Sequence, residues 1–168
     1  MEPSDFDVIF ATLQAAKVKY LVVGGVAVVL HGFPRFTADL DLVIALEPSN
    51  VVAALHALEG LGYRPRAPVD ARGLADPETR RAWIEDKNLT VFALWSPAHP
   101  ATEIDIFVEE PFPFDEAYAR ASRAELGAIH VAVASIPDLI AMKRRAARPK
   151  DLEDIRALEA LTQEEEHE

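Results

Sequence analysis

The sequence predicts an α/β protein of the α+β kind, with a mixed central sheet and flanking helices. Two observations favour this class. Predicted helices interleave with predicted strands along the chain, and two neighbouring pairs of strands are close enough in sequence to form hairpins. The chain has 168 residues, half of them hydrophobic, which suits one domain built around a single core.

The elements follow from apolar periodicity and from residues that begin or end them. Ser4 can cap the first helix, while Ser135 with Asp138 resembles a capping box. Residues 65–78 hold three prolines and one glycine, and so predict a loop. The expected helices cover residues 4–17, 26–30, 48–61, 77–87, 135–147 and 149–161. The expected strands cover residues 20–23, 39–46, 89–95, 102–108, 123–126 and 129–133.

The domain is expected to span residues 1–162, followed by an acidic flexible tail over 163–168. Four glutamates in this tail contribute to a net charge of −11, which argues against a general nucleic-acid coat protein. The positive charge is local: the segment 143–150 contains five Lys or Arg side chains. Such a patch is enough to hold a phosphate group.

Composition also bears on the compartment. The chain has no cysteine, which excludes disulfides and thiolate metal sites and fits a reducing cytoplasm. No apolar run approaches the roughly 18 residues of a membrane span. The first residues carry acidic rather than basic side chains, so a signal peptide is not expected. We therefore expect a cytoplasmic protein with no membrane partner.

Two carboxylates stand on one face of the strand predicted over 39–46. Because side chains alternate along a strand, Asp39 and Asp41 point the same way, while Leu40 and Leu42 point the other. An edge strand with a wet face is one interpretation. The other is a strand covered on both sides, in which two carboxylates need a compensating cation. Carboxylate oxygens suit magnesium, or manganese.

A third carboxylate is expected on the strand over 102–108. Asp105 is flanked by Ile104 and Ile106, and it joins the first two acids if the two strands are neighbours. Glu103 shares its face and is the rival candidate, although it lies nearer the strand's wet start. Three carboxylates can hold two magnesium ions about 3.5–4 Å apart, the arrangement used for in-line phosphoryl chemistry.

Gly24 and Gly25 lie between a predicted strand and a short helix. Paired glycines let the backbone approach a ligand closely, and a helix start offers amides to phosphate groups. An ordinary turn is the simpler interpretation. No Gly-Lys-Ser/Thr follows, so this is not a Walker loop, and the spacing does not match the dinucleotide-binding glycine pattern either.

Taken together, these segments resemble the DNA polymerase beta superfamily of minimal nucleotidyltransferases. The resemblance rests on Gly24-Gly25, then Asp39-Leu40-Asp41, then a later strand acid at Asp105. The segments 139–143 and 148–154 resemble the AbiEii-like branch, which includes toxins of toxin–antitoxin systems. Many relatives have Ser where Gly25 stands, so a phosphate contact there would come from the backbone amide.

The resemblance implies transfer of a nucleoside monophosphate from an NTP to an acceptor hydroxyl, with Asp39, Asp41 and Asp105 holding the metals. Asp105 is the best candidate for general base. Lys143 would bind the triphosphate and Asp151 would orient it. A cognate antitoxin is a possible partner, and a tRNA end, a protein or a small molecule remains open as the acceptor. The other candidate function is an antitoxin or regulatory module that binds nucleotide with little turnover.

Several of these side chains have simpler interpretations. Lys143 lies in the middle of an apolar helical stripe, either snorkelling at an edge or reaching an anion, with Asp151 or Asp105 as its expected resting partner. Asp151 also suits a helix N-terminus. Arg35 and Thr37 either contact phosphate or acceptor or are ordinary loop residues.

Overall fold

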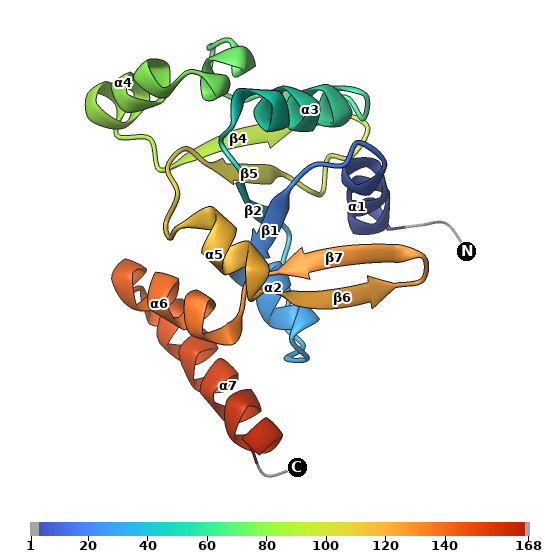
Figure 1. Cartoon of the computed structure of the whole chain (residues 1–168), viewed down its shortest axis with the longest axis vertical. Coiled ribbons are helices and arrows are strands. Elements are labelled where there is room, and N and C mark those ends of the chain that lie inside the picture. The colour runs from blue at the N-terminus through green and yellow to red at the C-terminus, as the bar shows by residue number, and fades with distance from the viewer. Residues whose placement is uncertain (1–3, 167–168) are drawn as a thin grey trace.

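The computed structural model describes residues 4–166 and has a seven-stranded mixed sheet with helices around it (Figure 1). The strand order is β3-β4-β5-β2-β1-β7-β6. The strands are β1 (Tyr20–Val23), β2 (Leu40–Ile44), β3 (Arg64–Pro65), β4 (Val91–Trp95), β5 (Ile104–Phe107), β6 (Ser122–Leu126) and β7 (Ile129–Val133). The helices are α1 (Asp5–Ala15), α2 (Gly24–Leu30), α3 (Pro48–Glu59), α4 (Pro77–Lys87), α5 (Phe114–Ala119), α6 (Ile136–Ala146) and α7 (Pro149–Glu166). The predicted mixed α/β class is confirmed.

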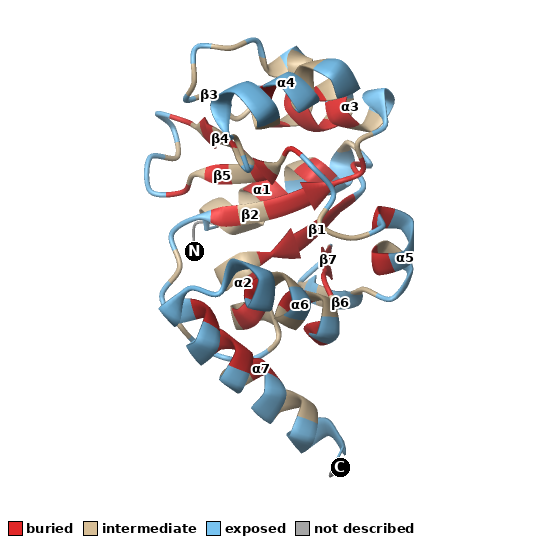
Figure 2. Ribbon diagram, turned by 90° about the vertical axis from the view of Figure 1, so that its left-hand side faces the viewer, coloured by how far each residue is buried: buried red, intermediate tan, exposed pale blue. Residues whose placement is uncertain are grey.

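The middle of the sheet is made by β5, β2 and β1. Strand β2 pairs antiparallel with β1 and parallel with β5, and β1 pairs parallel with β7. All four residues of β1 are buried, and so are Leu40 and Leu42 of β2 (Figure 2). Strands buried on both sides explain the near-continuous apolar runs in these segments. Both predicted hairpins form, as the antiparallel pairs β4–β5 and β6–β7.

The two C-terminal helices form a pair that extends away from the sheet (Figure 1). Ser135 caps α6, because its hydroxyl accepts a hydrogen bond from the backbone N–H of Asp138. Leu139 of α6 and Leu158 of α7 are buried and join the main core. Within residues 4–166, no helix combines the length and apolar character needed to cross a membrane.

The boundaries of several elements differ from the prediction. Strand β2 begins at Leu40, whose N–H donates to the carbonyl of Glu103 and starts the ladder, so the exposed Asp39 lies just before the strand. Helix α7 continues to Glu166 rather than ending near residue 161, because Gln and Glu are good helix formers even where they face water. The last two residues of the predicted tail, 167 and 168, lie outside the described residues.

Three elements were not predicted: β3, α5 and a 3₁₀ helix over Ala71–Ala75, which lies inside the segment predicted as a loop. Residues 64–65 form β3, which pairs with β4 and is too short to show an alternating pattern. Helix α5 follows Pro113 and buries only Phe114 and Ala117. Its six residues are fewer than two turns of apolar periodicity, so the sequence carried little signal for it.

Candidate active site

One pocket of about 550 Å³ gathers most of the predicted site residues. It lies where the ends of β1, β2 and β5 face the α6–α7 pair. Its lining includes Gly24, Gly25, Arg35, Asp39, Asp41, Asp105, Lys143 and Asp151. It also includes Arg148 and Lys150, which belong to the basic segment expected to hold a phosphate group, and Asp154 from the segment 148–154. Carboxylates from the sheet and cations, mostly from the C-terminal segment, therefore share one cavity.

Asp41 and Asp105 are register partners in the parallel pairing of β2 with β5. Neighbouring residues in register point to the same face of a sheet, so both carboxylates enter the pocket. Asp41 is half-buried, between the fully buried Leu40 and Leu42. The alternation that the sequence suggested is thus the arrangement that aims acids at the cavity and leucines at the core.

The charge of this carboxylate pair is unfavourable in the protein alone. Burial, followed by the negative charges of Asp105 and Asp39, raises the pKa of Asp41 to about 7. Burial, followed by the charges of Asp39 and Glu103, also raises the pKa of Asp105. A cation bound by both carboxylates would lower the pKa values of Asp41 and Asp105, because a nearby positive charge favours the ionised form of an acid.

The donor set fits a hard divalent cation by its chemistry, since carboxylate oxygens are the ligands that magnesium prefers. Asp39 lies at the same pocket, on the exposed segment just before β2. Across the described part of the chain, however, no three acidic, His or Cys side chains close around a common point that would hold a metal ion. Asp41 and Asp105 form the core of the site, and Asp39 stands at its edge.

Glu103, the rival to Asp105, is placed differently. Its side chain forms an ion pair with Arg66, and it is absent from the lining of the pocket. Of the two candidate acids, Asp105 is therefore the one that lines the cavity.

Gly24 fits tightly against Asp41. Its φ of +70° is a conformation that L side chains rarely adopt, and a Cβ at this position would collide with the carboxylate of Asp41. A Cβ at Gly25 would lie 2.9 Å from Oγ1 of Thr37. Thr37 in turn donates to the carbonyl of Asp39 at 3.3 Å. The glycine pair therefore allows the strand acids and the loop before β2 to approach the start of α2.

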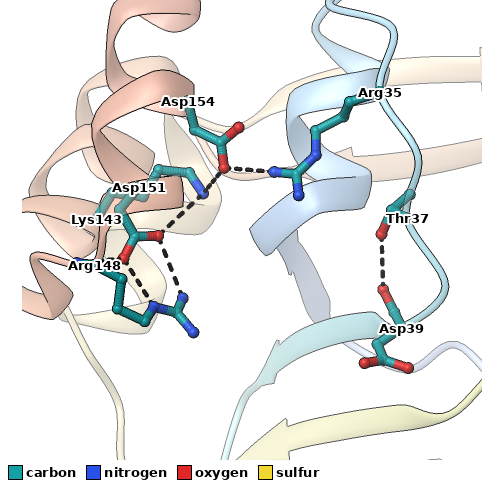
Figure 3. Close-up of polar contacts among 7 residues, drawn as sticks. All are labelled: Arg35, Thr37, Asp39, Lys143, Arg148, Asp151 and Asp154. Atoms are coloured by element: carbon teal, nitrogen blue, oxygen red, sulfur yellow. Dashed lines mark hydrogen bonds and ion pairs between the residues drawn. The ribbon is translucent and has the colours of Figure 1, made fainter.

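Lys143 is buried on the opposite side of the pocket, with 7% of its surface exposed. Its Nζ lies 2.9 Å from Oδ2 of Asp154 and 4.0 Å from Oδ1 of Asp151 (Figure 3). The expected partners were Asp151 or Asp105, but the nearest acid is Asp154. The crossing of α6 and α7 decides this, because it brings the second buried acid of α7 closest to the lysine.

Asp151 is almost fully buried and belongs to the same cluster. Arg148 donates to it from Nε at 2.8 Å and from its backbone N–H at 3.0 Å. Burial opposes ionisation of Asp151, but these hydrogen bonds outweigh burial and lower its pKa. Asp151 thus also caps the first turn of α7, as its simpler interpretation predicted.

Comparison with known proteins shows the family of this chain. The chain belongs to the family described as nucleotidyltransferases of unknown function (DUF6036), whose model matches residues 6–165. A search of curated proteins finds no match.

Several solved structures have a similar fold. The antibiotic-resistance factor ANT(2'')-Ia is 17% identical, with a TM-score of 0.57 over 91% of this chain and 80% of that chain. Another structure of ANT(2'')-Ia holds adenylyl-2''-tobramycin; it is 17% identical, with a TM-score of 0.55 over 91% of this chain and 84% of that chain. The lincosamide antibiotic adenylyltransferase LnuA, bound to lincomycin, is 17% identical, with a TM-score of 0.60 over 91% of this chain and 93% of that chain.

Proposed function

We propose that this protein transfers a nucleoside monophosphate from an NTP to a hydroxyl group of a small molecule in the cytoplasm. The observation that carries the proposal is the register pairing of Asp41 with Asp105 beneath a pocket that also contains Lys143, Arg148 and Lys150. Acids on one side of the pocket and cations on the other suit a metal-bound triphosphate that reacts with the hydroxyl of a second molecule.

Magnesium, or manganese, would be held by Asp41 and Asp105 with Asp39 at the edge. Such an ion supplies positive charge to the phosphate oxygens and lowers the pKa of a bound hydroxyl. Lys143 and Arg35 would orient the triphosphate, and the backbone at Gly24 and Gly25 would leave room for it.

The reaction balances simply. The acceptor oxygen forms a bond to the α-phosphorus, the bond from that phosphorus to the bridging oxygen breaks, and pyrophosphate leaves. The hydroxyl proton passes to Asp105, the carboxylate of β5 that lines the pocket. The cations of the pocket stabilise the negative charge that leaves with the pyrophosphate.

The choice of acceptor rests on two considerations. The structurally similar ANT(2'')-Ia is described as an antibiotic-resistance factor and LnuA as a lincosamide antibiotic adenylyltransferase, and antibiotics of this kind are small molecules. The net charge of −11 also disfavours a polyanionic acceptor, because repulsion at long range opposes its approach. The alternative is a toxin of the AbiEii-like kind, which would use RNA or protein as its acceptor and have a cognate antitoxin.

The test uses each α-³²P-labelled NTP with magnesium and a cell extract separated into RNA, protein and small-molecule fractions. Label entering the small-molecule fraction supports the proposal, and Asp105→Asn should abolish it. Glu103→Gln is the matched control, since Glu103 lies on the same strand segment but pairs with Arg66 outside the pocket. Label in RNA would favour a toxin-like role. Nucleotide binding without transfer would favour the antitoxin or regulatory module.

A further inference from the structure

Asp154 connects three separate segments through one oxygen atom. Its Oδ2 accepts hydrogen bonds from Nη1 of Arg35 at 2.5 Å and from Nζ of Lys143 at 2.9 Å (Figure 3). Arg35 comes from the loop between α2 and β2, Lys143 from α6, and Asp154 itself from α7. Asp154 is 4% exposed, so both bonds are made away from bulk water, where they are strong.

This contact is also the polar side-chain link between α7 and the part of the described chain that precedes α6. Within residues 4–166, the Arg35–Asp154 pair is the one side-chain hydrogen bond or ion pair that joins α7 to any residue before α6. The other link of the helical pair is Arg120–Asp138, at the start of α6, where Arg120 is half-exposed. The two helices otherwise pack mainly against each other.

We propose that Asp154 is a positioning residue for nucleotidyl transfer, a role that rests on the function proposed above. It holds the 31–39 loop, which leads into Asp39, against α7, and it fixes the directions of Lys143 and Arg35 within the pocket. A carboxylate repels a triphosphate, so Asp154 acts through the two cations rather than by touching the nucleotide.

That role has a kinetic signature. Replacing Asp154 by Asn keeps a carbonyl oxygen and the side-chain shape but removes a negative charge beside two cations. The affinity of the pocket for NTP should then stay the same or increase, while Lys143 and Arg35 are held less firmly in position. A misplacement of about 1 Å costs up to about 100-fold in rate. Asp154→Asn should therefore lower kcat about 10- to 100-fold without raising KM for ATP.

The experiment compares Asp154→Asn, Arg35→Met and the double variant with the wild-type chain. Glu159→Gln is the matched control, because it removes charge from the exposed Arg144–Glu159 pair between the same two helices, outside the pocket. Thermal melting checks that each variant is folded at the assay temperature. The readouts are pyrophosphate release from Mg-ATP with the acceptor fraction, ATP affinity by calorimetry, and amide hydrogen exchange of the 31–39 loop without nucleotide.

We expect Asp154→Asn to lose kcat with KM unchanged or lower, and Arg35→Met to lose kcat with a higher KM, because a cation of the pocket is removed. The kcat of the double variant should be no lower than that of the more severe single one. Loop amides should exchange faster in all three and at the wild-type rate in Glu159→Gln. Three results each overturn the inference: kcat losses that multiply in the double variant, a KM that rises in Asp154→Asn, or loop exchange that matches the wild-type rate.

The two proposals fail in different ways. If wild-type protein neither binds Mg-ATP nor releases pyrophosphate, the proposed function is wrong and the kinetic arm has no baseline. The exchange arm then decides on its own: faster loop exchange in Asp154→Asn and Arg35→Met supports the link between the loop and α7, and unchanged exchange refutes it.

Discussion

Asp41 and Asp105 lie directly opposite each other in the register of two parallel strands, and both carboxylates face the same pocket. Two acids in this arrangement repel each other unless a cation lies between them. The following metal and pH predictions depend on this pairing.

Magnesium or manganese should stabilise the fold, because a ligand that binds only the native state adds stability by linkage. At 100-fold excess over Kd this adds about 2.7 kcal/mol, a rise in Tm of roughly 5–10 °C for a chain of this size. ATP should add a further rise only when metal is present, and Asp41→Asn should abolish the metal effect. A melting temperature indifferent to metal in the wild-type protein would contradict the site.

Metal-free stability should fall as the pH rises from about 4 to about 7. The folded pKa of Asp41 is raised to about 7 from its ordinary value of 3.8, so the native state binds more protons than the unfolded state within this window. The loss should be on the order of 2 kcal/mol after solvent screening, and it should level off above the folded pKa. Urea unfolding of wild-type protein and Asp41→Asn across this range measures it. The variant should lack this part of the slope, and parallel profiles would contradict the raised pKa.

Lys143→Met should lower NTP affinity and turnover by roughly 10- to 1,000-fold, the scale seen when a preorganised charge is removed. In this variant Asp154 is still paired with Arg35, and Asp151 is still paired with Arg148. The stability loss should therefore be about 1–3 kcal/mol rather than complete unfolding. Lys143→Arg should rescue little, because a planar fork replaces a compact charge.

Arg145→Met is the control for this series. Arg145 is exposed on α6 and lies outside the lining of the pocket. If both methionine variants gave the same nucleotide titration, Lys143 would be only one member of a solvated basic patch.

Gly25→Ala should disturb Asp39 through Thr37. The added Cβ would lie 2.9 Å from Thr37 Oγ1, so the threonine must shift, and its hydroxyl donates to the Asp39 carbonyl. We expect turnover to fall about 10-fold, within the range for small misplacements. Thr37→Ala should restore part of the loss in Gly25→Ala by removing the obstructing oxygen. Gly60→Ala, at the end of α3, should leave turnover unchanged, and a Thr37→Ala change that deepens the Gly25→Ala defect would refute the mechanism.

Deleting residues from Glu164 onward should change the free energy of unfolding by less than about 0.5 kcal/mol, as for other exposed sites. Residues 164–166 extend α7 but are exposed, and they carry no apolar side chain. Chemical unfolding and NTP turnover of the shortened chain measure this. A large loss of either would mean that this segment docks against something that its exposure does not reveal.

The sequence indicated the local parts of the site well, because each depends on neighbouring residues. Alternation placed Asp41 and Asp105 on the opposite side of their strands from the flanking apolar residues, and two glycines indicated a close approach of the backbone. The structure adds what alternation could not supply: β5 is the parallel neighbour of β2, with Asp105 in register with Asp41. Many strand orders are compatible with the same local patterns.

Contacts between distant residues were the hardest to predict. Arg35 and Asp154 are 119 positions apart, and nothing in either local pattern selects the other. For Lys143, the helical stripe indicated an inward position but not which acid of α7 lies nearest, because that depends on how α6 and α7 cross. Helix α5 and strand β3 were missed because neither is long enough to show a period.

The order of the site along the chain has a consequence for synthesis on the ribosome. The sheet with its carboxylates is complete once β7 has been made at Val133, whereas Lys143, Arg148 and Lys150 arrive only with α6 and α7. A nascent chain that has folded its sheet presents acids to an incoming triphosphate, with Arg35 as the cation lining the pocket from that earlier part. The pocket therefore gains most of its positive charge only when α6 and α7, which are synthesised after the sheet, dock against it.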